Sequence, residues 1–193
     1  MTPRGPVLES MWSEPNPKAE SEHHSMPPPL EPPDTHYFAA TVGWIELGNL
    51  AEAKAELSRI SPECQRHPDV LELKWMLCAE EKDWKGGLEV AQSLLELSPE
   101  RASAWLHQAY ALRRVPDGSV RKAWDALLPA FEKFPKEFLI AYNLACYACQ
   151  MSDLENARLW LQRAQKVSDP KKVKAMALAD SDLESLWKEI AES

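Results

Sequence analysis

The chain contains 193 residues, of which 45% are hydrophobic, so one domain of ordinary size with a substantial core is expected. Its formal net charge of −8 at pH 7 would repel phosphate backbones and anionic lipid surfaces. We therefore expect neither nucleic acid nor a membrane as a partner.

Residues 1–33 hold nine of the sixteen prolines and few apolar side chains. Such a segment cannot bury enough surface to offset the entropy of ordering, so we predict a disordered, Pro-rich tail. Pro29–Pro32 has PxxP spacing, but no neighbouring Arg or Lys supports a ligand role, and a plain linker is favoured. Whether the tail occupies a groove of the folded part stays open. Asp34 follows and is expected to cap the first helix.

Beyond residue 33 the apolar spacing is helical, and one pattern returns four times. Small residues recur at steps of 34, 36 and 34 positions, at Ala53, Gly87, Ala123 and Ala157. A fixed period of this length predicts a helix–turn–helix unit copied in tandem, and such units stack into a solenoid. The turns within the units are expected at Gly48-Asn49, Lys82-Asp83, Val115–Ser119 and Ser152-Asp153.

The unit resembles the tetratricopeptide repeat, most clearly in Tyr142–Arg158 and in the turn Gly48–Ala53. The resemblance implies an all-α fold, a right-handed α-solenoid, with four repeats at 34–67, 68–101, 102–137 and 138–171. It also implies small residues where the two helices of a unit cross. These are Thr41, Ala109 and Ala145 on the first helices, opposite Ala53, Ala123 and Ala157.

Three segments depart from the regular pattern. In the second unit Trp75 stands where a small residue belongs, and we predict that it packs over Gly87. The third unit has two extra residues around Arg113–Gly118, which lengthen its turn. Pro129 is expected to kink the second helix of that unit.

Residues 172–193 are predicted to form a capping helix. Ser181 and Glu184 have the spacing of a capping box. A terminal cap needs one apolar face to cover the last repeat and one polar face toward water. The apolar residues on one helical face are Leu183, Leu186, Trp187 and Ile190.

Tetratricopeptide repeats form a curved groove lined by the first helix of each unit, and the resemblance implies the same lining here. The expected partner-binding residues are Phe38, Glu46, Glu72, Met76, Leu106, Tyr110, Arg113, Arg114, Leu139, Tyr142 and Cys146. Tyrosine and arginine often dominate binding energy, and arginine grips carboxylates through its planar fork. A protein or peptide with an acidic segment is therefore the expected ligand.

Other roles for these residues stay open at this stage. Arg113 and Arg114 could simply be solvated in the turn beside Pro116, and Tyr110 and Tyr142 could pack between neighbouring first helices. The carboxylate clamp of chaperone-tail-binding members is not expected, because Phe38 and Val42 stand where that clamp has Lys and Asn.

Signals for chemistry are weak. Cys146 and Cys149 form a CxxC pair, but they lie in mid-helix, away from the helix N-terminus that would activate a thiol. Cys64 and Cys78 belong to distant units, so we expect neither metal nor cofactor. His107 is expected to contact a neighbouring helix. No glycine-rich phosphate loop, nucleophile elbow or HExxH motif is present, so an enzyme is not expected.

These features together predict a non-enzymatic protein–protein interaction module, an adaptor or assembly factor that binds a peptide or helix in its concave groove. Four cysteines are too few for a disulfide scaffold, and no apolar run is long enough for a signal peptide or a membrane span. A soluble, cytoplasmic protein is therefore expected. Two alternatives stay open: a chaperone for a secreted or aggregation-prone client, and a self-assembling structural repeat. The oligomeric state is not predicted.

Overall fold

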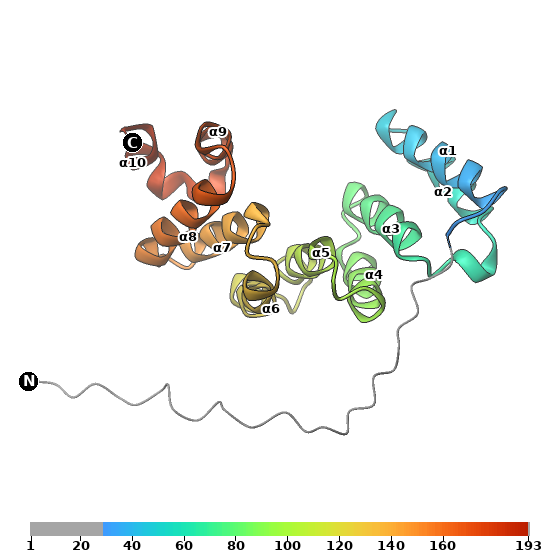
Figure 1. Cartoon of the computed structure of the whole chain (residues 1–193), viewed down its shortest axis with the longest axis horizontal. Helices are drawn as coiled ribbons and strands as arrows, with labels where there is room; N and C mark the ends of the chain where they lie inside the picture. The colour runs from blue at the N-terminus through green and yellow to red at the C-terminus, as the bar shows by residue number, and fades with distance from the viewer. Residues whose placement is uncertain (1–28, 193) are drawn as a thin grey trace, which may run out of the picture.

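The computed structural model describes residues 29–192, which fold into helices without a β-strand. Eight of the helices form four consecutive pairs, and Figure 1 shows these pairs following one another in a row. The all-α solenoid class predicted from the repeat period is confirmed. The pairs are α1 (Asp34–Glu46) with α2 (Leu50–Ser58), α3 (Pro68–Glu80) with α4 (Trp84–Leu97), α5 (Ala102–Leu112) with α6 (Val120–Lys133), and α7 (Phe138–Gln150) with α8 (Leu154–Val167).

The start of the described chain differs from the prediction at Leu30 and at Asp34. Residues 1–28 of the expected tail lie outside the described residues, and Leu30 packs against the buried apolar cluster that includes Ala53 and Leu57. Asp34 does not cap α1, because Pro33 occupies the capping position without a side-chain bond. The Asp34 carboxylate instead accepts hydrogen bonds from the Ser61 amide at 2.9 Å and from the Ser61 hydroxyl. These bonds lower the pKa of Asp34 and tie the start of α1 to the end of the first unit.

Three of the four turns within the units share one backbone conformation. Each contains one residue in the left-handed region, which lets the first helix end and the chain reverse. The next residue accepts a hydrogen bond from the amide three positions on and so caps the second helix. The left-handed residues are Gly48 (φ 72°), Lys82 (φ 59°) and Ser152 (φ 63°). The capping residues are Asn49, Asp83 and Asp153.

The longer turn of the third unit closes differently. Ser119 caps α6 by accepting from the Lys122 amide. Gly118 lies so close to the preceding helix that an added Cβ would come 1.9 Å from the Leu112 carbonyl oxygen. Only glycine therefore fits this loop. Pro129 lies inside α6, and the helix continues past it to Lys133.

The crossings within the units are close, as the small residues predict. The crossing residues are fully buried: Thr41, Ala53, Ala109, Ala123, Ala145 and Ala157. In the second unit a Cβ added to Gly87 would lie 3.8 Å from Trp75 Nε1, so the predicted packing of Trp75 over Gly87 is confirmed. Gly87, which is smaller than the alanine of the other units, leaves room for the large Trp75 side chain of the first helix.

The C-terminal segment is more elaborate than the single capping helix expected over 172–193. It consists of α9 (Pro170–Ala179), the 3₁₀ helix η2 (Ser181–Leu186) and α10 (Trp187–Glu192). Asp180 caps η2 by accepting from the Asp182 amide, so Ser181 does not form the expected capping box. Leu183, Leu186 and Ile190 are nonetheless buried against the large core, as a cap requires.

Candidate partner-binding groove

The first helices of the units present equivalent positions along one face. Val42, Met76 and Tyr110 are separated by one repeat of 34 residues, and the equivalent residue of the fourth unit is Cys146. Met76 is 41% exposed, whereas Val42 and Tyr110 are half-buried. Cys146 is only 1% exposed. One end of the predicted groove is thus covered, and the section along α1, α3 and α5 is more open.

The cover over α7 is the chain's own C-terminal segment. Tyr142 donates its hydroxyl to Asp180 at 3.1 Å, and the Arg113 guanidinium binds both carboxylate oxygens of Asp182. Gln150 donates to the Asp182 carbonyl. Tyr142 is 5% exposed, so a partner cannot reach it or Cys146 in this arrangement. Two of the predicted binding residues, Arg113 and Tyr142, do bind acidic groups, but these groups belong to residues 180–182 of the same chain.

The protonation of this covered region follows from its burial. Burial and the nearby carboxylates raise the pKa of Cys146 and that of Tyr142, so both stay neutral. The ligand atoms of Cys146, Asp180 and Asp182 lie within 4.8 Å of one another. Arg113 and Tyr142 already use these carboxylates as hydrogen-bond acceptors. The cluster therefore serves to hold the C-terminal segment on α7.

An aromatic cluster lies where α3, α4 and α5 meet. The ring of Trp75 stacks on His107 with centroids 3.7 Å apart, and its edge meets Tyr110 at 5.9 Å. Tyr110 also contacts Trp84 at 5.7 Å. The Arg114 guanidinium lies over Tyr110 at 3.4 Å and over Trp84 at 5.1 Å. We call Trp75, Trp84, His107, Tyr110 and Arg114 the aromatic cluster.

The sequence pattern indicates Tyr110 and Arg114 as binding residues but does not indicate the two tryptophans of this cluster. The pattern places Trp75 only at the helix crossing, and Trp84 opens a second helix, which the groove pattern does not include. The available signal was the large size of Trp75, which extends beyond the crossing and reaches the next unit. His107 contacts a neighbouring helix, as predicted.

Polar groups join α3 to α5 beside the aromatic cluster. Ser103 Oγ donates to Glu72, and His107 Nε2 lies 2.6 Å from the other Glu72 oxygen. Burial raises the pKa of Glu72, but the bonds to His107 and Ser103 outweigh it, so the pKa lies below its ordinary value. Ser103 and His107 each bind Glu72 rather than each other. The arrangement is therefore not the serine–histidine hydrogen bond of a nucleophile and its general base. The three residues form a structural tie.

The remaining predicted groove residues are less prominent. Phe38 and Leu106 are half-buried and pack against core clusters, and Leu139 is half-buried at the start of α7. Glu46 is exposed at the end of α1. The structure thus brings Met76, Tyr110 and Arg114 to the open section and leaves Tyr142 and Cys146 beneath the C-terminal segment.

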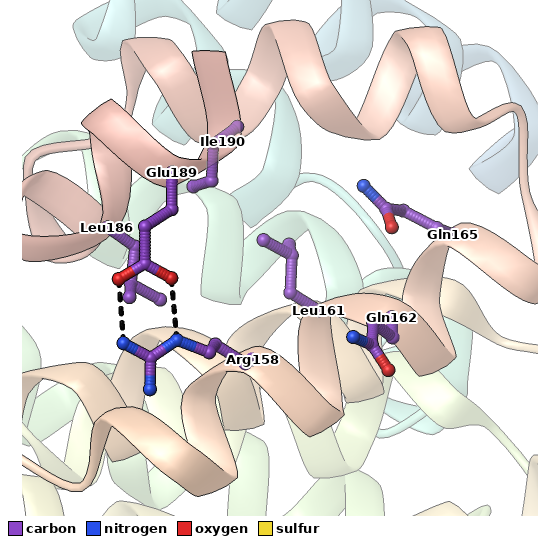
Figure 2. Close-up of a pocket in the computed structure, with 7 residues that line it drawn as sticks. All are labelled: Arg158, Leu161, Gln162, Gln165, Leu186, Glu189 and Ile190. Carbon is purple, nitrogen blue, oxygen red and sulfur yellow. Dashed lines mark hydrogen bonds and ion pairs between the residues drawn. The ribbon is translucent and has the colours of Figure 1, made fainter. Parts of the chain in front are cut away.

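A separate small pocket lies between α8 and the C-terminal segment (Figure 2). Leu161 and Leu186 form part of its wall, and the ion pair between Arg158 and Glu189 closes one side at 2.6 Å. Both charged side chains of this pair are about half exposed. The cavity volume is 170 Å³, and it lies apart from the aromatic cluster.

Comparisons with known proteins bear on the fold. The sequence matches no family model, and no curated protein shows a significant match. Among solved structures, the MamA RS-1 ArsTM double mutant is similar, with a TM-score of 0.60 and 16% sequence identity. The match covers 70% of this chain and 75% of that one. This likeness shows a tetratricopeptide-like fold. Within residues 29–192 no helix combines the length and apolar character needed to span a membrane.

Proposed function

We propose that this chain is a protein-interaction module that holds a peptide or helix of a partner on the face formed by α1, α3 and α5. The observation that carries the proposal is the path of residues 180–186 across α7, on the same face of the repeat. Tyrosine, arginine and glutamine side chains hold this acidic segment there. The repeat surface therefore already accommodates polypeptide in the way a ligand would be held.

The open section has the composition of a binding surface. Trp, Tyr and Arg side chains are over-represented where binding energy concentrates, and the aromatic cluster supplies all three. Methionine adapts its shape to varied apolar partners, and Met76 is exposed beside this cluster. An adaptor or assembly factor, which holds one protein near another, is the role that this arrangement supports best.

The test is affinity capture from a lysate of the native organism, with partners quantified by mass spectrometry. We expect Met76→Glu to lose a specific partner, because a charge in the apolar row would have to be desolvated on binding. Leu128→Glu is the matched control, since Leu128 is 39% exposed on α6. Loss of the partner from the Leu128 variant alone would place binding on the α6 face and refute the proposal.

Light scattering on the same proteins addresses the other candidate roles. A concentration-dependent mass that Leu128→Glu abolishes and Met76→Glu leaves unchanged would indicate self-assembly instead. A monomer that captures its partner through Met76 is the expected result.

A further inference from the structure

A row of charges follows the open section of the groove. Glu46, Glu80 and Arg114 are separated by 34 residues each: Glu46 and Glu80 are the last residues of α1 and α3, and Arg114 lies two residues past the end of α5. They are therefore equivalent positions of three successive units. Two acidic positions are followed by one basic position. The adjacent row of Val42, Met76 and Tyr110 lies one helical turn away, four residues earlier in each unit.

The two glutamates are available to a partner. Both are exposed, and among residues 29–192 neither Glu46 nor Glu80 has an ion-pair partner. Other acidic groups of the groove are already used: Asp69 pairs with Arg101, and Glu72 is bound by Ser103 and His107. The free negative charge of this section is thus concentrated at one end.

Arg114 lies at the other end of the row of charges, and its contacts differ from those of Arg113. Arg113 is bound to Asp182, whereas no carboxylate of the described chain lies within ion-pair distance of Arg114. The Arg114 guanidinium is held by the Tyr110 and Trp84 rings and by a bond to the Tyr110 carbonyl at 2.9 Å. Burial lowers the pKa of Arg114, as expected for a cation that lacks a counter-charge. A positioned guanidinium of this kind suits a carboxylate.

From these positions we propose that the groove selects a partner segment with segregated charges. The segment has apolar side chains that cover Val42, Met76 and Tyr110, a basic end that faces Glu46 and Glu80, and an acidic end that faces Arg114. This inference rests on the proposed function and adds the chemistry of the ligand. The contact between Arg113 and Asp182 shows the same pairing within the chain, one position before Arg114.

The length of the row sets the spacing of those charges. Directly packed helices lie about 8–10 Å apart, so the row from Glu46 to Arg114, which crosses three first helices, spans at least roughly 16–20 Å. An extended peptide covers this distance with about five or six residues. A helix would need about twelve. The basic residue that faces Glu80 and the acidic residue that faces Arg114 are one helix spacing apart, so about two or three positions of an extended peptide separate them.

The experiment is a selection of displayed random peptides of about twelve residues against the whole chain, long enough to span the row. Enriched sequences are compared with those from Met76→Glu, Glu80→Lys and Arg114→Glu. Arg121→Glu is the control, because it makes the same charge change at an exposed site on α6. Circular dichroism verifies that each variant is folded. If Arg114→Glu is not folded, the comparison rests on Glu80→Lys, because Glu80 is exposed.

The whole chain is expected to enrich peptides with basic residues at one end and acidic residues at the other. Arg114→Glu should remove the acidic end, Glu80→Lys should remove the basic end, and Arg121→Glu should change neither. For one enriched peptide, Arg114→Gln should weaken binding about tenfold, as expected for a half-buried, charge-assisted contact. Arg114→Gln should not change the affinity for a version of this peptide in which glutamine replaces the acidic residues.

The outcomes separate this inference from the function on which it rests. Peptides that depend on Met76 but carry unsegregated charge, or that are unchanged by both charge reversals, would overturn the inference and leave the groove as the binding surface. Failure to enrich any peptide over the Met76→Glu variant would overturn both.

Discussion

The ion pair between Arg113 and Asp182 is predicted to hold the C-terminal segment on the groove. It joins residues 69 positions apart, and the two side chains are 16% and 23% exposed. Breaking a fully buried pair costs about 3–5 kcal/mol, and a hydrogen bond to a charged group contributes about 1.5–3 kcal/mol. Because solvent reaches this pair in part, we expect Asp182→Asn to lower the free energy of unfolding by about 2 kcal/mol.

The assay is a double-mutant cycle with Asp182→Asn and Arg113→Met. Urea unfolding is followed by circular dichroism and by tryptophan fluorescence, and coincident transitions justify two-state values. We expect a coupling energy of about 1.5–2 kcal/mol between the two positions. The methionine retains part of the arginine stem, so the cycle reports the loss of charge rather than of packing.

A matched control is the pair Arg158–Glu189, which also binds the C-terminal segment but has side chains 44% and 52% exposed. Exposed ion pairs contribute roughly 0.2–1 kcal/mol, so a cycle of Arg158→Met with Glu189→Gln should give a coupling energy near the lower end of this range. Equal couplings for the two pairs, or an additive Arg113–Asp182 cycle, would refute the reasoning that partial burial makes the inner pair strong.

Two further predictions concern stability. Gly118→Ala should destabilise the chain by about 1–3 kcal/mol in urea unfolding, since its Cβ would overlap a backbone carbonyl. Gly43→Ala, where nothing lies within 4 Å, should be neutral or stabilising, and a similar loss at both sites would contradict the argument. Because the folded-state pKa of Glu72 is lowered, its contribution is present above the unfolded value, near 4.3, and is lost as pH falls through the folded value. Glu72→Gln should therefore flatten stability against pH below about 5, and an unchanged profile would count against the His107 contact.

The repeat was predictable because its determinants are local. A left-handed residue followed by Asn or Asp specifies each regular turn, and small residues specify each crossing. Tyr142 and Cys146, four residues apart, also share one face of α7 as their spacing predicts, since both contact Asp180. Periodicity within one unit contains all of this information.

The C-terminal segment could not be predicted in the same way. Its apolar spacing fits a single amphipathic helix, yet Asp180 ends α9 and starts a 3₁₀ helix that turns toward α7. That path depends on Arg113, Tyr142 and Gln150, which lie 30 or more positions earlier. The aromatic cluster has the same long-range origin, because Trp75 and His107 belong to different units.

The reactivity of Cys146 can show whether the C-terminal segment opens on its own. Cys146 is 1% exposed under this segment, and its raised pKa leaves little thiolate, so labelling requires opening. With the other three cysteines replaced by serine, we expect Asp182→Asn to raise the labelling rate of Cys146 about 30-fold, which corresponds to about 2 kcal/mol. Arg158→Met should raise it less than about threefold, since the outer pair is weak. If labelling instead follows global unfolding in urea for every variant, the segment is an inseparable part of the core. If labelling exceeds global unfolding, the segment opens locally, and the groove along α7 becomes accessible without loss of the fold.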